Sequence, residues 1–84
     1  MKHFAVSRFW QGYEHLSPDT QKQADKQFPL LKANPRHPSL HLRKVGRYWP
    51  ARVNATTRAV AVEQDGNLVW FWIGTHRDYE KLIG

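Results

Sequence analysis

The residues best suited to chemistry follow the most apolar stretch of this 84-residue chain. Residues 68–73, LVWFWI, contain no polar side chain. Soon after them come His76, Arg77 and Tyr79, which supply a titratable ring, a cation and a phenol. Histidine donates or accepts a proton near neutral pH, and arginine matches the geometry of phosphate oxygens. A rigid strand that ends beside these groups is a good position for an active site.

The apolar stretch itself is typical of a central strand in a covered sheet, because neither of its faces is polar. Strict alternation would divide its side chains into Leu68, Trp70 and Trp72 on one face and Val69, Phe71 and Ile73 on the other. Gly74 then allows a sharp change of direction. Thr75, with Asp78 three residues later, predicts a capped helix start. The titratable segment is therefore expected to open a short C-terminal helix.

Charge and composition narrow the class of protein. Thirteen Lys and Arg against seven Asp and Glu give a net charge of +6, which favours a polyanionic partner, either nucleic acid or an acidic protein. A hydrophobic fraction of 40% with four tryptophans argues against disorder and predicts a single domain over residues 1–84. No apolar run approaches the ~20 residues that cross a bilayer, and no signal-peptide core is present, so a cytoplasmic location without membrane contact is expected. The absence of cysteine excludes disulfides and thiolate metal sites.

The first half of the chain predicts a helix over residues 8–16. Phe9, Tyr13 and Leu16 recur at helical spacing and would form its apolar face. Gly12 weakens such a helix by roughly 1 kcal/mol relative to alanine. This helix must therefore depend on packing.

A second helix is expected from Ser17-Pro18, a side-chain cap followed by proline at the first helical position. Helical spacing predicts that it buries Ala24, Phe28 and Leu31. Pro29 removes one backbone donor, which predicts either a kink or a break followed by one more turn.

Two-residue periodicity then predicts three strands before the apolar one, near residues 40–45, 48–53 and 58–63. Pro50 favours an edge position for the second of them, because proline cannot donate to a ladder. Asp65-Gly66 predicts a tight hairpin into the apolar strand. With a short strand at residues 2–6, the order becomes β-α-α-β-β-β-β-α. We expect an α+β fold in which a helical pair covers one face of a mainly antiparallel sheet.

Four segments in this order resemble the RelE/ParE superfamily of bacterial toxins from type II toxin-antitoxin operons. They are HPSLHLRKV, YWPARV, TRAVAVE and VWFWIGTHRDY. The resemblance covers nearly the whole chain and implies the small RelE/ParE-like fold. Histidine-using members carry a Gly-Thr-His step after the last strand, which residues 74–76 match, and often a phenolic residue soon after it, the place of Tyr79. Members also often have one arginine near the end of a middle strand and another opening the next strand, the places of Arg52 and Arg58.

Members of this family either cleave mRNA, mostly in the ribosomal A site, or poison DNA gyrase. The Gly-Thr-His step favours cleavage, because a protein that only binds does not need it. The resemblance therefore implies a metal-independent endoribonuclease without a cofactor, which acts on mRNA at the ribosome and inhibits translation until an antitoxin protein neutralises it. Operator DNA would be bound only by the toxin–antitoxin complex. The alternatives are a gyrase inhibitor without catalysis, and an inactive member that binds only its antitoxin and operator DNA.

Metal-free cleavage of RNA needs a base, an acid and cations, because a ribose 2′-oxygen attacks the neighbouring phosphate. Histidine suits proton transfer, since the pKa of imidazole is ~6.5. We therefore assign His76 as general acid or base, with Arg58 and Arg52 binding the phosphate. Tyr79 would stack on a base or orient the phosphate, and His41 is a possible second proton-transfer group. The structural alternative is that His76 is merely exposed in a first helical turn and that Tyr79 belongs to the core.

A basic segment in the middle of the chain forms the second candidate site. The residues predicted to contact the RNA backbone, together with Arg77, are Arg36, His37, Arg43, Lys44 and Arg47. The alternative is a solvated face without a ligand. His37 and His41 are four residues apart, but a linker and a strand give them no common helical face, so no metal site is expected. If one face of the apolar strand were open, it would form a groove for the antitoxin.

Overall fold

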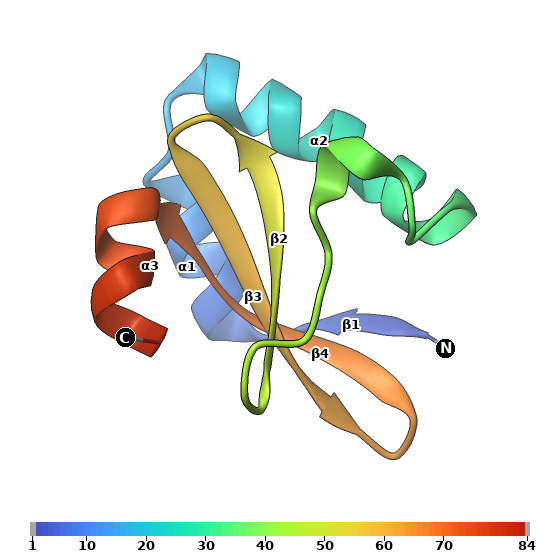
Figure 1. Cartoon of the computed structure of the whole chain (residues 1–84). Coiled ribbons are helices and arrows are strands. Elements are labelled where there is room, and N and C mark those ends of the chain that lie inside the picture. The colour runs from blue at the N-terminus through green and yellow to red at the C-terminus, as the bar shows by residue number, and fades with distance from the viewer. Residues whose placement is uncertain (1, 84) are drawn as a thin grey trace.

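The computed structural model describes residues 2–83 (Figure 1). Its elements are β1 (His3–Ala5), α1 (Ser7–Glu14), α2 (Pro18–Ala33), the 3-10 turn η1 (Pro38–Leu40), β2 (Tyr48–Asn54), β3 (Thr57–Gln64), β4 (Asn67–Thr75) and α3 (His76–Ile83). The four strands form one sheet in the order β1-β4-β3-β2. Only β1 and β4 are parallel, so the predicted α+β fold with a mainly antiparallel sheet is confirmed. None of the described helices is long and apolar enough to span a membrane.

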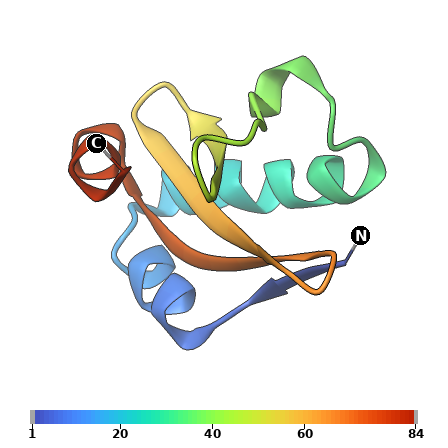
Figure 2. The same cartoon turned by 60° about the horizontal axis from the view of Figure 1, so that its bottom comes forward.

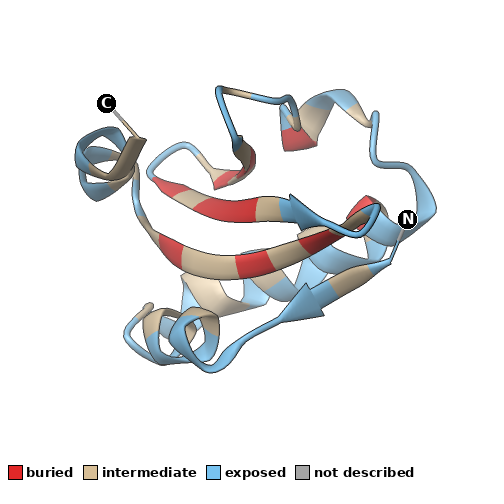
Figure 3. Cartoon of the chain, turned by 90° about the horizontal axis from the view of Figure 1, so that it is seen from below, coloured by how far each residue is buried: buried red, intermediate tan, exposed pale blue. Residues whose placement is uncertain are grey.

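The helical pair covers one face of this sheet, as predicted. Helix α1 packs on β4 and α2 packs on β2, whereas α3 contacts β3 and β4 (Figure 2). The buried positions gather on the strands (Figure 3). The buried core consists of Leu31, Leu40, Ala51, Val53, Ala59, Ala61, Leu68, Trp70 and Ile73. The central place of β4 and the edge place of β2, which carries Pro50, are both confirmed.

Local signals set the ends of several elements. The Ser17 Oγ accepts a hydrogen bond of 3.2 Å from the Thr20 backbone N–H, and Pro18 is the first residue of α2. Asp65 and Gly66 take φ angles of 53° and 78° and join β3 to β4 in two residues. Positive φ at both positions is the signature of the tight hairpin that the Asp-Gly pair predicts.

A close approach of helix and strand explains the glycine in α1. A Cβ atom at Gly12 would lie 2.5 Å from the backbone oxygen of Ile73 in β4. Only a residue without a side chain allows this separation. Packing against β4 therefore supports the helix that glycine weakens.

Helix α2 differs from the prediction in two places. It continues through Pro29 to Ala33, so the predicted break does not form. Leu31 is buried and Ala24 is partly buried, but Phe28 is 48% exposed. Phe28 instead lines a largely apolar cavity of about 230 Å³ between the helices and the sheet, where nothing covers it completely.

A β-bulge overturns the strict alternation predicted for the apolar strand. The residues on either side of Phe71 pair with Val60 and Ala61, which are consecutive on β3, so Phe71 has no partner there. The extra residue places Ile73, rather than Trp72, in the core beneath the helices. The prediction of two apolar faces was right, but its assignment of Trp72 and Ile73 was wrong.

The strand predicted for residues 40–45 is also wrong. This segment begins in η1, after which His41 takes a left-handed φ of 47°, a conformation that cannot continue a strand. Its one β-bridge to the sheet, among the described residues, joins Val45 to Tyr48. Leu40 is only 1% exposed, so the apolar spacing reflects burial of this side chain in the core.

Candidate functional site

A shallow cleft of about 480 Å³ opens on the sheet face that the helical pair leaves uncovered. Its lining comes from three parts of the chain: the segment after η1, the middle of β2 with the start of β3, and helix α3. The lining residues are His41, Leu42, Arg43, Pro50, Ala51, Arg52, Arg58, His76 and Tyr79. All five residues that the sequence predicted for catalysis therefore meet in one cleft.

The cleft holds two arginines that face each other across neighbouring strands. Arg52 of β2 lies directly opposite Arg58 of β3. Like charges at such positions destabilise a sheet. No carboxylate balances them, since the one ion pair among residues 2–83 joins His76 to Glu80. The arrangement is suited to a bound anion that would supply the missing negative charge.

Burial of the Arg58 guanidinium, followed by the like charge of Arg52, lowers the pKa of Arg58. Arginine is so strongly basic that the group stays charged. Its Nη1 donates to the backbone oxygens of Asn54 at 2.6 Å and Thr57 at 3.0 Å. The turn between β2 and β3 thereby orients the guanidinium within the cleft.

Helix α3 begins at the cleft because of local capping and one tertiary contact. The Asp78 backbone N–H donates to the Thr75 Oγ1 at 3.1 Å, which confirms the predicted cap. The His76 backbone N–H donates to the oxygen of Thr56 at 2.7 Å. This second bond ties the first residue of α3 to the same turn that orients Arg58.

The His76 ring is held by residues of its own helix. Its Nε2 lies 2.9 Å from the Glu80 Oε1, one turn further on, while the His76 and Glu80 side chains are 44% and 67% exposed. A carboxylate accepts a hydrogen bond, so Nε2 carries the proton in this arrangement. The Nδ1 atom is buried, without a hydrogen-bond partner among residues 2–83. Sequence reasoning missed Glu80, although its i, i+4 spacing from His76 was an available signal.

Tyr79 contacts the same ring. The centroids of His76 and Tyr79 are 5.8 Å apart and the two planes are inclined by 28°, a stacked arrangement. Tyr79 is partly exposed and lines the cleft instead of joining the buried core. The stack places a phenol beside the imidazole, because residues at i and i+3 are neighbours on one helix face.

The segment after η1 supplies His41 and Arg43 to the cleft. Figure 1 shows this segment alongside β2, whereas α3 lies on the other side of the strands. Both residues are exposed, and the left-handed backbone at His41 marks the change of direction after the 3-10 turn. An imidazole therefore stands on each side of the arginine pair.

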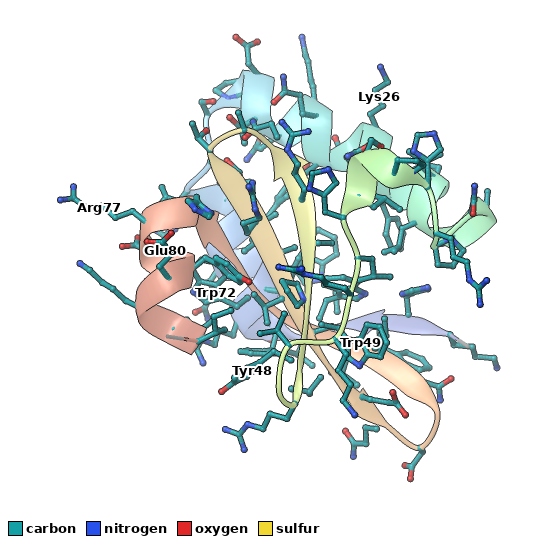
Figure 4. All side chains as sticks on the ribbon, in the orientation of Figure 1. Lys26, Tyr48, Trp49, Trp72, Arg77 and Glu80 are labelled. Atoms are coloured by element: carbon teal, nitrogen blue, oxygen red, sulfur yellow. The ribbon has the colours of Figure 1, made fainter. Side chains whose placement is uncertain are left out.

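The remaining residues predicted to bind RNA lie outside this lining. They are Arg36, His37, Lys44, Arg47 and Arg77. The His37 Nδ1 lies 2.9 Å from the Ser39 Oγ within η1. Arg77 points away from the body of the protein in Figure 4.

Within residues 2–83 no three His, Cys, Asp or Glu residues gather as metal ligands.

Sequence comparison finds neither a matching family model nor a matching curated protein. Solved structures do match. They include a YoeB/ParE toxin from Agrobacterium tumefaciens, with a TM-score of 0.68 and 19% identity over 90% of this chain and 99% of that one. A chain of the RelB-RelE antitoxin-toxin complex from Methanococcus jannaschii gives a TM-score of 0.74 and 8% identity over 96% and 99%. YafQ from E. coli gives a TM-score of 0.69 and 15% identity over 93% and 96%. The chain has the fold of the RelE/ParE toxins, as the resemblance implied.

Proposed function

We propose that this protein is a RelE-like toxin that cleaves RNA without a metal and is neutralised by an antitoxin protein. The shared fold supports a toxin, and one of the similar structures is an antitoxin-toxin complex. The observation that carries the proposal is the pair of Arg52 and Arg58, which has no carboxylate partner among residues 2–83, in a cleft flanked by His76 and His41. Two cations between two imidazoles match the needs of a phosphodiester undergoing transesterification.

In this reaction the ribose 2′-oxygen forms a bond to the adjacent phosphorus, and the bond from phosphorus to the 5′-oxygen breaks. The products are a 2′,3′-cyclic phosphate and a free 5′-hydroxyl. Arg52 and Arg58 bind the non-bridging oxygens and stabilise the added negative charge of the pentacoordinate intermediate. The turn that holds the Arg58 guanidinium keeps this charge in place before the substrate arrives.

Two proton transfers accompany the change in bonding. As the imidazolium, His76 donates a proton to the departing 5′-oxygen from its outer nitrogen Nε2, which lies beside Glu80, and is left as the neutral ring. His41 accepts the proton of the 2′-hydroxyl from the other side of the cleft. Each positioned group typically contributes about 10²–10⁴ in rate. Tyr79, stacked on His76, orients the phosphate or stacks on a base.

The wider substrate in this proposal is mRNA on the ribosome in the cytoplasm, as the family resemblance implies. A net charge of +6 favours binding to polyanionic RNA. The five predicted RNA-binding residues outside the cleft would bind the backbone of the message or of ribosomal RNA by releasing counterions. Operator DNA would be bound by the toxin–antitoxin complex only.

Primer extension on a reporter mRNA in a translation reaction tests the proposal. Wild-type protein should produce discrete new 5′ ends, and His76→Ala should produce none. His15→Ala is the matched control, because His15 is an exposed histidine in the turn after α1 and does not line the cleft. This control should cleave like the wild type.

Other outcomes would change the proposal in defined ways. Cleavage by both wild type and His76→Ala would keep the nuclease but assign proton transfer to other groups. If the wild type does not cleave the mRNA and translation continues, the proposed nuclease activity is refuted. A DNA gyrase supercoiling assay would then test the second activity associated with this fold.

A further inference from the structure

Four side chains form a cation–aromatic ladder outside the cleft. The Arg47 guanidinium lies 5.2 Å over the Tyr48 ring, and its Nη2 donates to the Tyr48 hydroxyl at 3.1 Å. The Tyr48 and Phe71 rings have centroids 6.1 Å apart, and the Arg8 guanidinium lies 5.7 Å over Phe71. We call Arg47, Tyr48, Phe71 and Arg8 the ladder.

The ladder includes the bulged residue of the central strand. Phe71 is the extra residue of β4, and bulges redirect side chains and occur beside active sites. The pairing of β1 with β4 ends at Trp70, so the neighbouring start of α1 can bring Arg8 to the ring.

The ladder is accessible to a ligand. Arg8 and Arg47 are exposed, whereas Tyr48 and Phe71 are partly exposed. Neither arginine forms an ion pair within residues 2–83. Planar cations and rings without carboxylate partners are suited to single-stranded RNA, whose phosphates bind arginine and whose bases stack on aromatic rings. An acidic peptide would use the charges but not the ring faces.

The ladder is continuous with the cleft. Tyr48, Pro50 and Arg52 alternate along β2, so their side chains share the face that the helices leave uncovered. Tyr48 and Arg52 are four residues apart, or about 13 Å along a strand. This distance corresponds to about four nucleotides at the ~3.4 Å rise of a stacked strand. A chain held at the ladder would therefore reach the arginine pair within a few nucleotides.

We propose that the ladder is a subsite for the substrate strand, a few nucleotides from the scissile phosphate. Bases stack on Tyr48 and Phe71, and the phosphates between them contact Arg47 and Arg8. This inference rests on the proposed RNA-cleaving function and adds the contacts that hold the strand in register.

Binding of an uncleavable RNA separates this contact from catalysis. The probe is a fluorescent single-stranded oligonucleotide of about 12 nucleotides, within the usual site sizes, with every 2′-hydroxyl methylated so that no 2′-oxygen can attack. Fluorescence anisotropy of the full chain should show about tenfold weaker binding for Tyr48→Leu, from the loss of a stacked base. For Arg47→Gln, the slope of log affinity against log salt should fall by about 0.7, the loss of one phosphate contact to a single strand.

Lys26→Gln is the matched control. It removes the same charge from α2, where Lys26 points away from the sheet in Figure 4. Its affinity and salt slope should stay close to those of the wild type. Arg47 is exposed, so Arg47→Gln remains informative even if Tyr48→Leu fails to fold.

Equal affinity and equal salt slope in the wild type and the folded ladder variants would overturn the inference, as would no binding by the wild type. A second arm measures sedimentation of each variant with ribosomes. Weakened sedimentation with unchanged oligonucleotide binding would assign the ladder to ribosomal RNA and overturn the substrate-strand subsite. Primer extension tests the proposed RNA cleavage independently of these binding measurements. A wild type that cleaves while the ladder variants bind normally would preserve the proposed function and refute the subsite.

Discussion

Replacing Arg52 by glutamine should make this protein more stable and less active. Arg52 and Arg58 are opposite each other on β2 and β3, and no carboxylate pairs with either within residues 2–83. Removing one charge relieves this repulsion, while the shorter glutamine keeps part of the packing. The same change removes one of the two cations proposed to bind the phosphate. Stability and activity should therefore move in opposite directions.

Both magnitudes follow from the geometry. Like charges at opposite positions destabilise a sheet by about 0.2–1 kcal/mol, and the partial exposure of both side chains favours the middle of that range, ~0.5 kcal/mol. For a domain of this size, ~1 kcal/mol shifts Tm by about 4–8 °C, so Arg52→Gln should gain about 2–4 °C. A hydrogen bond to a charged group contributes about 1.5–3 kcal/mol, so RNA cleavage should fall roughly 10- to 150-fold.

Thermal unfolding at low and high salt, with single-turnover cleavage of RNA, measures both effects. The gain in Tm should shrink at high salt, because salt screens partly exposed charges. Arg52→Lys keeps the charge and should show no gain, whereas Lys26→Gln should change neither quantity. A loss of stability in Arg52→Gln, or a gain that salt does not alter, would refute the repulsion argument. Unchanged cleavage would refute the phosphate contact.

Three further predictions concern the scaffold. Gly12→Ala should lower the free energy of unfolding measured in urea, because the new Cβ would lie 2.5 Å from the backbone oxygen of Ile73. This clash should outweigh the helix preference of alanine, ~1 kcal/mol. A stabilised variant would contradict the close approach of helix and strand. Burial of the ring, with smaller contributions from nearby positive charges, lowers the pKa of His3, whose Nδ1 accepts a 3.1 Å hydrogen bond from the Trp70 Nε1. The folded state therefore favours the neutral ring. The resulting stabilisation should be complete above the unfolded pKa of ~6.5 and should decline as pH falls through the lowered pKa of the folded state. The free energy of unfolding of His3→Gln should therefore depend less on pH than that of the wild type. Thr75→Ala should cost about 1 kcal/mol in the same urea assay through loss of the cap on α3, and Thr75→Ser should restore most of it.

Elements that depend on neighbours in the chain were predictable from the sequence. Ser17 with Pro18, Asp65 with Gly66, and the Thr75 cap were all read correctly as helix or hairpin signals. Each works through hydrogen bonds or φ preferences that span only a few residues. The family resemblance and the apolar strand then indicated the fold class.

The errors arose where the fold, rather than the local pattern, sets the conformation. A bulge at Phe71 exchanged the faces of Trp72 and Ile73. The alternating pattern of apolar residues does not show where a bulge occurs. The left-handed turn at His41 ended the expected strand, because burial of Leu40 overrides strand periodicity.

The sequence by itself determined which groups were available for chemistry: two imidazoles, two arginines and a phenol, in a chain with a large positive charge. Only the tertiary structure decided that these groups share one cleft and that Arg52 opposes Arg58 with no carboxylate partner among residues 2–83. Strand register and helix placement set these distances, and both depend on contacts between residues far apart in the chain.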